Sequence, residues 1–151
     1  MIDKRDDDFL ETNIKGLMMT LLARWNQEMD AARAETEFAG IRPADMRVFG
    51  QLRGREVPLS ALHRELSVSR QAAQQAIERL VAHGVVRVDA AEGSRRDKVV
   101  SVTEKGQRWR AIAAAEIRRI EVKVAEVVGE DGREDLRRLL VALAKDSGGV
   151  R

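Results

Sequence analysis

The chain has 151 residues, enough for one domain with a buried core of its own. Apolar residues make up 44% and charged residues 34%, a balance typical of a folded globular chain and not of a disordered one. There is no cysteine, which excludes disulfides and thiol-based redox sensing, and with only two histidines we expect no metal site. We can draw no signal peptide or membrane span and therefore expect a cytoplasmic protein.

The formal net charge of +2 hides an uneven distribution along the chain. Residues 1–58 carry a net charge of −2, residues 59–110 carry +4, and residues 111–151 are neutral. A basic middle between acidic and neutral ends is expected when one segment meets a polyanion. Taken alone, a surplus of four charges is also compatible with an ordinary solvated surface.

Helical periodicity dominates the first third of the chain. Apolar residues recur at steps of three and four from residue 9 to about residue 34, which predicts one long amphipathic helix. Pro43 suits the first position of a second, short helix, with Asp45 in its first turn. The buried side of this helix is predicted to consist of Met46, Phe49 and Leu52.

The middle of the chain contains two short helices in close succession. Ser60 is predicted to be the N-cap of the first, which runs to about Leu66. Ser69 is predicted to cap the second, and Gly84 to end it. Two helices joined by so tight a turn are typical of a helix-turn-helix.

After Gly84 the period changes from helical to extended. Two β-branched runs, at residues 85–88 and 99–102, predict a two-stranded hairpin with a charged loop of ten residues, 89–98, between them. Loops of this length are more often functional than short ones. This loop contains three cations, Arg95, Arg96 and Lys98.

The last third is predicted to be helical again. Thr103 is expected to cap a long helix that runs to about residue 128, and Gly129 and Gly132 separate it from a final helix. We therefore expect a mainly α fold with a small β-hairpin wing, a winged helix-turn-helix with N- and C-terminal helices for dimerisation. The predicted segments are 9–40 and 104–145 for dimerisation and 41–103 for the winged helix-turn-helix.

The second helix of the pair has an outward face suited to duplex DNA. If Ala73, Ile77 and Leu80 face the core, the outward residues are Arg70, Gln71, Gln74, Gln75 and Glu78. Gln pairs with adenine edges and Arg with guanine edges in the major groove, and Ser69 with the free N–H groups of the first turn suits a phosphate. Arginines on the wing can enter a minor groove. The alternatives are a solvated helix face and a charged turn that protects a hairpin edge.

Three segments resemble the MarR family of bacterial transcriptional regulators, with the last of them the most specific. They are residues 59–70 (LSALHRELSVSR), 77–87 (IERLVAHGVVR) and 94–106 (SRRDKVVSVTEKG). The resemblance implies that residues 69–75 read DNA and that Arg96 enters the minor groove. Two positions depart from the family pattern: Ser94 replaces the usual Asp of the wing, and Arg42 replaces the usual Ser or Thr before Pro43, so that we expect a less well capped helix start.

The resemblance also implies a homodimer, and the composition of the terminal helices favours one. These helices carry more apolar surface than a lone winged-helix module needs to cover, and a two-fold interface would bury it. The alternative is that the helices only pack on one another within one chain. The residues predicted at the interface are Leu10, Ile14, Leu17, Ile120, Val124, Leu136, Leu139, Leu140 and Leu143.

No catalytic motif is present, so we expect no enzyme activity and no cofactor. The resemblance implies a cleft for a small aromatic or amphipathic anion, for which the candidates are Arg24, Trp25, Met46, Arg47, Phe49 and Trp109. For any one of these residues, the favoured alternative is that the apolar side chains are core and the arginines are solvated. We expect a dimeric DNA-binding regulator that represses by occupying a pseudo-palindromic operator and responds to a ligand. The alternative is a winged-helix dimer that binds another protein and no DNA.

Overall fold

The computed structural model describes residues 1–93 and 97–148 and divides into two compact units. One unit comprises residues 26–113, and the other comprises residues 1–25 and 114–151. Helices α2 (Ile14–Ala34) and α6 (Glu104–Gly148) contribute residues to both units. Within the described residues, no helix is both long and apolar enough to cross a membrane.

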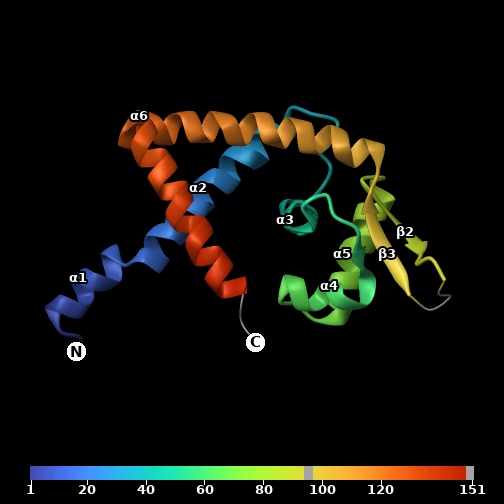
Figure 1. The fold of residues 1–151 in the computed structure, drawn as a ribbon, viewed down its shortest axis with the longest axis horizontal. Coiled ribbons are helices and arrows are strands. Elements are labelled where there is room, and N and C mark those ends of the chain that lie inside the picture. The colour runs from blue at the N-terminus through green and yellow to red at the C-terminus, as the bar shows by residue number, and fades with distance from the viewer. Residues whose placement is uncertain (94–96, 149–151) are drawn as a thin grey trace. The chain divides into compact units, whose positions relative to one another are not determined.

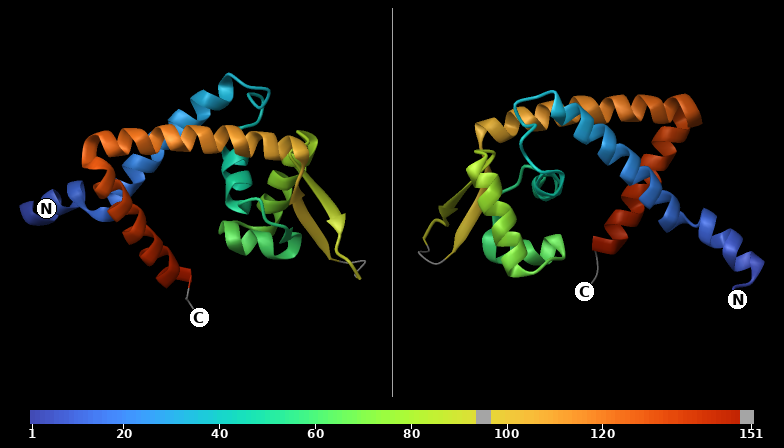
Figure 2. Two further views of the ribbon diagram at one scale, coloured as in Figure 1. Left: turned by 45° about the horizontal axis from the view of Figure 1, so that its top comes forward. Right: turned by 180° about the vertical axis from the view of Figure 1, so that it is seen from behind.

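The unit formed by residues 26–113, called the winged unit below, contains three short helices and a small sheet (Figure 1). Its helices are α3 (Pro43–Leu52), α4 (Leu59–Leu66) and α5 (Arg70–Ala82), and its strands are β1 (Val57–Pro58), β2 (Val86–Ala90) and β3 (Lys98–Val102). The strands are antiparallel in the order β1-β3-β2, with Val57 opposite Val100 and Val88 opposite the same residue on the other side. Figure 2 shows the β2–β3 hairpin as a narrow arm.

The core of the winged unit draws on every one of its elements. Phe38 packs against Trp109 with ring centroids 5.6 Å apart, and both rings are buried. Leu52, Leu80 and Val100 contribute from α3, α5 and β3 and have no exposed surface. The predicted buried sides of α3 and α5 are therefore confirmed: Met46, Phe49, Leu52, Ala73, Ile77 and Leu80 are all buried.

Several predicted helix ends are confirmed, and one is wrong. Pro43 begins α3, Ser69 caps α5 by accepting a hydrogen bond from the N–H of Ala72 (3.1 Å), and Gly84 has the positive φ that ends the helix. Arg42 precedes α3 without a side-chain cap, as its departure from the family pattern implies. Ser60, however, lies inside the first turn of α4, because the helix already begins at Leu59 with Pro58 as its N-cap.

The predicted N-terminal helix is two helices, α1 (Lys4–Thr12) and α2. The break is at Asn13, whose backbone is extended. Its amide group donates to the carbonyls of Phe9 and Leu10, while its Oδ1 accepts from the N–H of Gly16. One side chain thus ends one helix and caps the next, an interaction that competes with a continuous helix.

The wing differs from the prediction in two ways. Asp89 and Ala90 continue β2 opposite Val99 and Lys98, so the loop spans seven residues, 91–97, and not ten. A third strand, β1, pairs with β3. With two residues, one of them proline, β1 is too short to leave a periodic pattern in the sequence.

Helix α6 starts with a hydrogen-bonded cap at the end of the wing. Thr103 donates from Oγ1 to the carbonyl of Gly84 and accepts from the N–H of Gly106, which confirms it as a cap. Lys105 donates from Nζ to the carbonyl of His83 (2.9 Å). The start of α6 is therefore tied to the turn that ends α5. Farther along, Gly129 has non-helical backbone angles (φ 81°, ψ 164°) and divides α6 where the sequence predicts a break.

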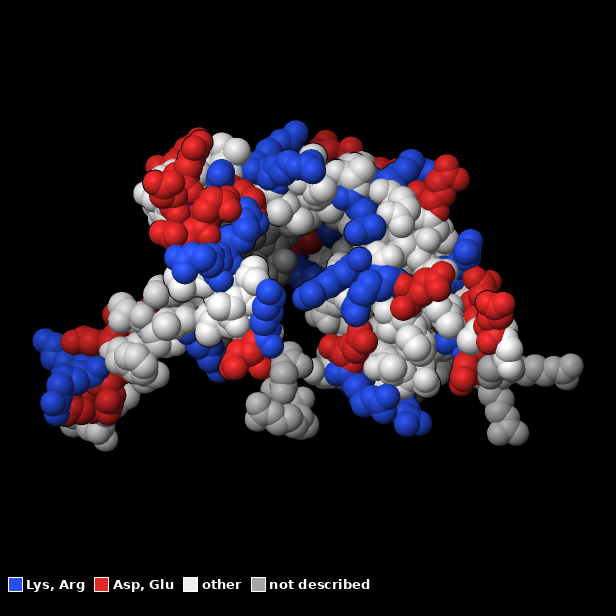
Figure 3. All heavy atoms as spheres, viewed as in Figure 1, with Lys and Arg blue, Asp and Glu red and all other residues white. Residues whose placement is uncertain are grey.

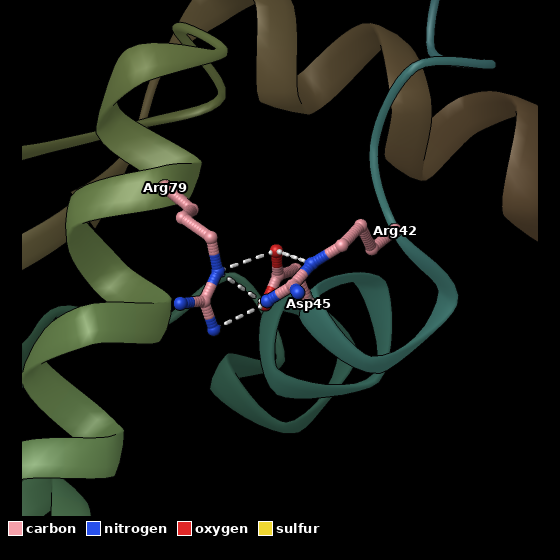
Figure 4. A network of polar contacts seen from close by, with 3 residues as sticks. All are labelled: Arg42, Asp45 and Arg79. Carbon is pink, nitrogen blue, oxygen red and sulfur yellow. Dashed lines mark hydrogen bonds and ion pairs between the residues drawn. The ribbon is translucent and has the colours of Figure 1, made fainter.

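A buried carboxylate holds α5 against α3 (Figure 4). Asp45 of α3 is 1% exposed and accepts from Nε of Arg79 (2.9 Å to Oδ2), from Nη2 of the same residue (3.0 Å to Oδ1) and from Nε of Arg42 (3.3 Å). Burial alone would raise the pKa of Asp45. The hydrogen bonds and charges of the two arginines outweigh burial and hold that pKa below its ordinary value. The position of α5 therefore depends on an ionised Asp45.

We expect Gly106→Ala to destabilise the fold by about 2–3 kcal/mol, because the added methyl group overpacks a full site. Its Cβ would overlap the carbonyl oxygen of Val85 and lie 2.6 Å from Cγ1 of Val102. Gly50→Ala is the matched control, since its Cβ meets nothing within 4 Å and alanine favours helix by about 1 kcal/mol. Urea unfolding measures both. Equal effects of the two substitutions would contradict the packing of Gly106.

We expect Asp45→Asn to lower the free energy of unfolding by about 2 kcal/mol at pH 7, because it leaves the guanidinium of Arg79 without its charged partner. The folded-state pKa of Asp45 is lowered, so its contribution is complete above the unfolded pKa of 3.8 and is lost as pH falls through the folded pKa. The difference from wild type should therefore shrink in acid, as urea unfolding between pH 7 and pH 3 would measure.

Asp135→Asn is the matched control for the buried carboxylate. Asp135 pairs with Arg138, and both side chains are about two-thirds exposed. An exposed pair contributes on the order of 0.5 kcal/mol or less. A loss at Asp45 no greater than the loss at Asp135 would show that α5 does not depend on the buried carboxylate.

Candidate nucleic-acid interface

Helix α5 separates its residues into a buried side and an exposed side, as the sequence predicts. Ala76 joins the predicted buried residues and is 5% exposed. The opposite side presents exposed polar side chains at steps of one, three and four residues: Arg70, Gln71, Gln74, Gln75 and Glu78. We call these five residues the α5 face. Their spacing places all five on one stripe, a shape that fits a groove of DNA.

The turn before α5 fixes where this face begins. Ser67 adopts the left-handed backbone conformation (φ 55°) after α4 and donates from its N–H to the carbonyl of Arg64. Val68 donates from its N–H to the carbonyl of His63. Ser69 then caps α5, because its side-chain oxygen accepts a hydrogen bond from the N–H of Ala72 in the first turn of the helix. The cap does not occupy the other first-turn N–H groups.

One hydrogen bond lies within the α5 face. Nε2 of Gln74 donates to Oε1 of Glu78 at 3.3 Å, across one turn of helix. Gln71 and Gln75 have no side-chain partner in the part of the chain that the structure describes. Their amides are therefore available to donate to and accept from a base edge, while that of Gln74 is partly committed.

Several exposed cations of the winged unit form no ion pair within the described residues, and one of them, Arg70, belongs to the α5 face. Among residues 1–93 and 97–148, Arg64, Arg70 and Lys98 are exposed and form no ion pair. Arg55, by contrast, pairs with Glu65 at 3.1 Å and Arg87 with Asp89 at 2.9 Å. Basic side chains gather at the lower edge of the winged unit in Figure 3. Unpaired surface cations beside an exposed Gln and Arg face favour contact with a polyanion.

The wing contributes one of its three predicted cations to the described surface. Lys98 is exposed at the first position of β3, opposite Ala90. Arg95 and Arg96, together with Ser94, lie outside the described residues. Their roles in the wing remain predictions.

An open pocket adjoins the α5 face. Its volume is about 210 Å³. Three elements line it, α4, α5 and the start of β3, with Leu59, Ser60, His63, Arg70, Gln74, Asp97 and Lys98. From the sequence, a phosphate contact by His63 of α4 is the less favoured alternative to a half-buried or solvated helical histidine. The structure shows His63 half-buried.

The residues predicted to line an effector cleft fall into different environments. Met46, Phe49 and Trp109 are buried in the core of the winged unit. Arg24 is exposed and Trp25 half-buried, and both belong to the other unit. The structure therefore does not show these residues together around one cleft.

Arg47, the remaining member of that set, is held by an acidic partner. Its Nη2 donates to Asp30 at 3.0 Å, and Asp30 also accepts from Nη1 of the buried Arg33 at 2.8 Å. Burial would raise the pKa of Asp30, but the hydrogen bonds and charges of the two arginines lower it below its ordinary value. Arg47 is therefore already engaged at an ionised carboxylate.

Comparison with known proteins agrees with this geometry. Residues 48–106 match the sequence family described as the winged helix DNA-binding domain. This range includes the second half of α3 and the whole of β1, α4, α5 and the wing. No curated protein matches the chain significantly.

Solved structures match over most of the chain at low sequence identity. MarR aligns with a TM-score of 0.75 and 17% identity over 92% of this chain and 100% of its own. Streptococcus pneumoniae FabT, solved in complex with DNA, aligns with a TM-score of 0.72 and 15% identity over 91% and 97%. Bordetella bronchiseptica BpsR, whose DNA binding is regulated by 6-hydroxynicotinic acid, aligns with a TM-score of 0.57 and 19% identity over 85% and 98%. The chain therefore has the fold of the MarR regulators, and its residues 48–106 are similar to winged helix DNA-binding domains.

Proposed function

We propose that the chain is a sequence-specific, double-stranded DNA-binding transcriptional regulator that acts as a homodimer on a pseudo-palindromic operator. The observation that carries the proposal is the α5 face, where Arg70, Gln71 and Gln75 are exposed and form no side-chain hydrogen bond or ion pair within the described residues. These are the side-chain types that pair with guanine and adenine edges in the major groove. The complex of FabT with DNA supports the same use of this fold.

Support for a dimer comes from the unit formed by residues 1–25 and 114–151. Among its described residues, Ile120 is the one buried hydrophobic side chain, at 6% exposed. Val124 is half-buried. The other residues predicted at the interface are 36–74% exposed: Leu10, Ile14, Leu17, Leu136, Leu139, Leu140 and Leu143. A monomer seldom leaves so much apolar surface in water, and a second copy of the same surface would cover it.

We further propose that a small aromatic or amphipathic anion releases the regulator from DNA, so that it acts as a ligand-responsive repressor. The regulation of BpsR by 6-hydroxynicotinic acid supports this for the fold. In this chain Arg24 is exposed and unpaired among the described residues, and so is accessible to an anion. Met46, Phe49 and Trp109 are packed in the core, so an effector that reaches them must displace core contacts. Because Met46 and Phe49 belong to α3, such a displacement would shift this helix.

We expect the chain to select preferred duplexes from a random pool, with affinity that falls steeply as salt rises. On a selected duplex, Gln71→Ala with Gln75→Ala should weaken binding about tenfold or more, because each bidentate base contact contributes about 1–3 kcal/mol. Gln27→Ala with Gln51→Ala is the matched control, since both side chains are exposed away from the α5 face. Fluorescence anisotropy measures the affinities.

Two results would contradict the proposal of sequence-specific DNA binding. If no duplex binds at low salt, the protein-interaction module is the better description. If the double variant at Gln71 and Gln75 binds the selected duplex as wild type does, the α5 face does not read bases.

We expect Leu17→Glu to weaken the dimer at least tenfold, because a charge replaces an apolar side chain in the covered surface. Leu17 is 48% exposed in the single chain. Val68→Glu, at a side chain that is 42% exposed in the winged unit, is the control and should leave the dimer intact. Light scattering after size-exclusion chromatography measures the mass. A wild-type protein that is monomeric at micromolar concentration would refute the dimer.

A further inference from the structure

The α5 face contains one acidic side chain, Glu78. A carboxylate on a surface that meets DNA repels the phosphate backbone and so lowers affinity for any duplex. Glu78 is exposed, and its carboxylate forms no ion pair among the described residues. The hydrogen bond that it accepts comes from another member of the same face, Gln74. A role for Glu78 is therefore sought through that glutamine.

The hydrogen bond decides which end of the Gln74 amide faces Glu78. Nε2 of Gln74 donates to Oε1 of Glu78 at 3.3 Å, between residues one helical turn apart. The reverse orientation would place the amide oxygen against a carboxylate oxygen, and these two acceptors repel each other. Glu78 therefore engages one N–H of Gln74 and leaves the amide oxygen and the second N–H for a ligand.

The other two glutamines of the α5 face lack such a partner. Gln71 and Gln75 form no side-chain hydrogen bond within the described residues. The residue one turn after Gln71 is Gln75, and the residue one turn after Gln75 is Arg79, whose guanidinium binds Asp45. Gln74 is thus the glutamine of this face whose amide has one preferred orientation.

The groups that remain on Gln74 match an adenine edge better than a guanine edge. In the major groove, adenine presents the N7 acceptor and the N6 amino donor, whereas guanine presents two acceptors, N7 and O6. One amide oxygen and one N–H together satisfy adenine. Guanine requires two donors, and one N–H of Gln74 is already bound to Glu78. The carboxylate of Glu78 would also repel the two acceptors of guanine.

We propose that Glu78 is a specificity-determining residue, which orients the amide of Gln74 so that this position of the α5 face selects adenine over guanine. The inference rests on the proposed DNA binding and gives Glu78 a positioning role that acts through Gln74. The same carboxylate repels the backbone of every duplex, so it increases specificity while it lowers affinity.

The test measures binding of wild type and Glu78→Ala to two duplexes that differ at one base pair. Selection from a random pool with wild type and with Gln74→Ala identifies that base pair as the position where the preference is lost. There we expect wild type to prefer adenine to guanine about tenfold or more, and Glu78→Ala to prefer it less than about threefold. The change should come from tighter binding of the guanine duplex, because alanine removes the repulsion and frees the second N–H of Gln74.

Three further variants separate positioning from other roles of Glu78. Glu78→Asp keeps a carboxylate one turn from Gln74, a pairing that stabilises helices, and should retain most of the preference. In a Gln74→Ala background, Glu78→Ala should leave the remaining preference unchanged. Glu35→Ala removes an exposed carboxylate of the winged unit outside the α5 face and should keep the wild-type preference. Thermal unfolding checks that each variant is folded.

The possible outcomes separate this inference from the proposed function. If wild type binds no duplex, DNA binding itself fails. If wild type binds but Glu78→Ala prefers adenine as strongly as wild type does, the positioning role is wrong, and the α5 face can still read bases through Gln71 and Gln75. If Glu78→Ala changes the preference equally with and without Gln74, the carboxylate contacts a base directly, which also overturns the inference. A wild-type preference for guanine at this position would contradict it as well.

Discussion

The contact between Asp45 and Arg79 is the constraint on which the geometry of the α5 face depends. Asp45 is buried at the start of α3, and Arg79 lies on α5 one residue after the end of the exposed stripe. A bidentate contact fixes direction as well as distance, so it sets the rotation of α5 about its own axis. That rotation decides whether Arg70, Gln71 and Gln75 face solvent or the core. Burial of the ionised Asp45 would be costly without its two arginines. The packing of α5 against α3 and the ionisation of Asp45 therefore depend on each other.

The second anchor of α5 is at its other end. Thr103 and Lys105 bind the carbonyls of Gly84 and His83, which are groups that a helix leaves unsatisfied where it ends. Gly106 allows the start of α6 to approach the carbonyl of Val85. Residues 103–106 end the segment 94–106, the most specific part of the resemblance to the MarR family. Their identities have a physical explanation, because Thr103, Lys105 and Gly106 pack the start of α6 against the turn that ends α5.

The two units differ in how much of their apolar surface is buried within the single chain. In the winged unit, core residues from all elements are buried, and its exposed surface is polar and in places positively charged without internal compensation. In the other unit, leucine, isoleucine and valine side chains are largely exposed in the single chain. The proposed function assigns the first surface to a charged and hydrated partner and the second to another copy of the chain.

The sequence by itself determined the features that depend on local periodicity and on single residues with strong backbone preferences. These include the helix start at Pro43, the cap at Ser69, the ends at Gly84 and Gly129, the two main strands of the wing, and the separation of α5 into buried and exposed sides. Only the tertiary structure decided the break at Asn13, the strand β1, the burial of Asp45 and the pocket at His63. Each of these arises from hydrogen bonds or contacts whose partners are either too few to form a pattern or too distant along the chain. Asp45 and Arg79, 34 residues apart, share no periodicity, and their attraction acts only once α3 and α5 pack together.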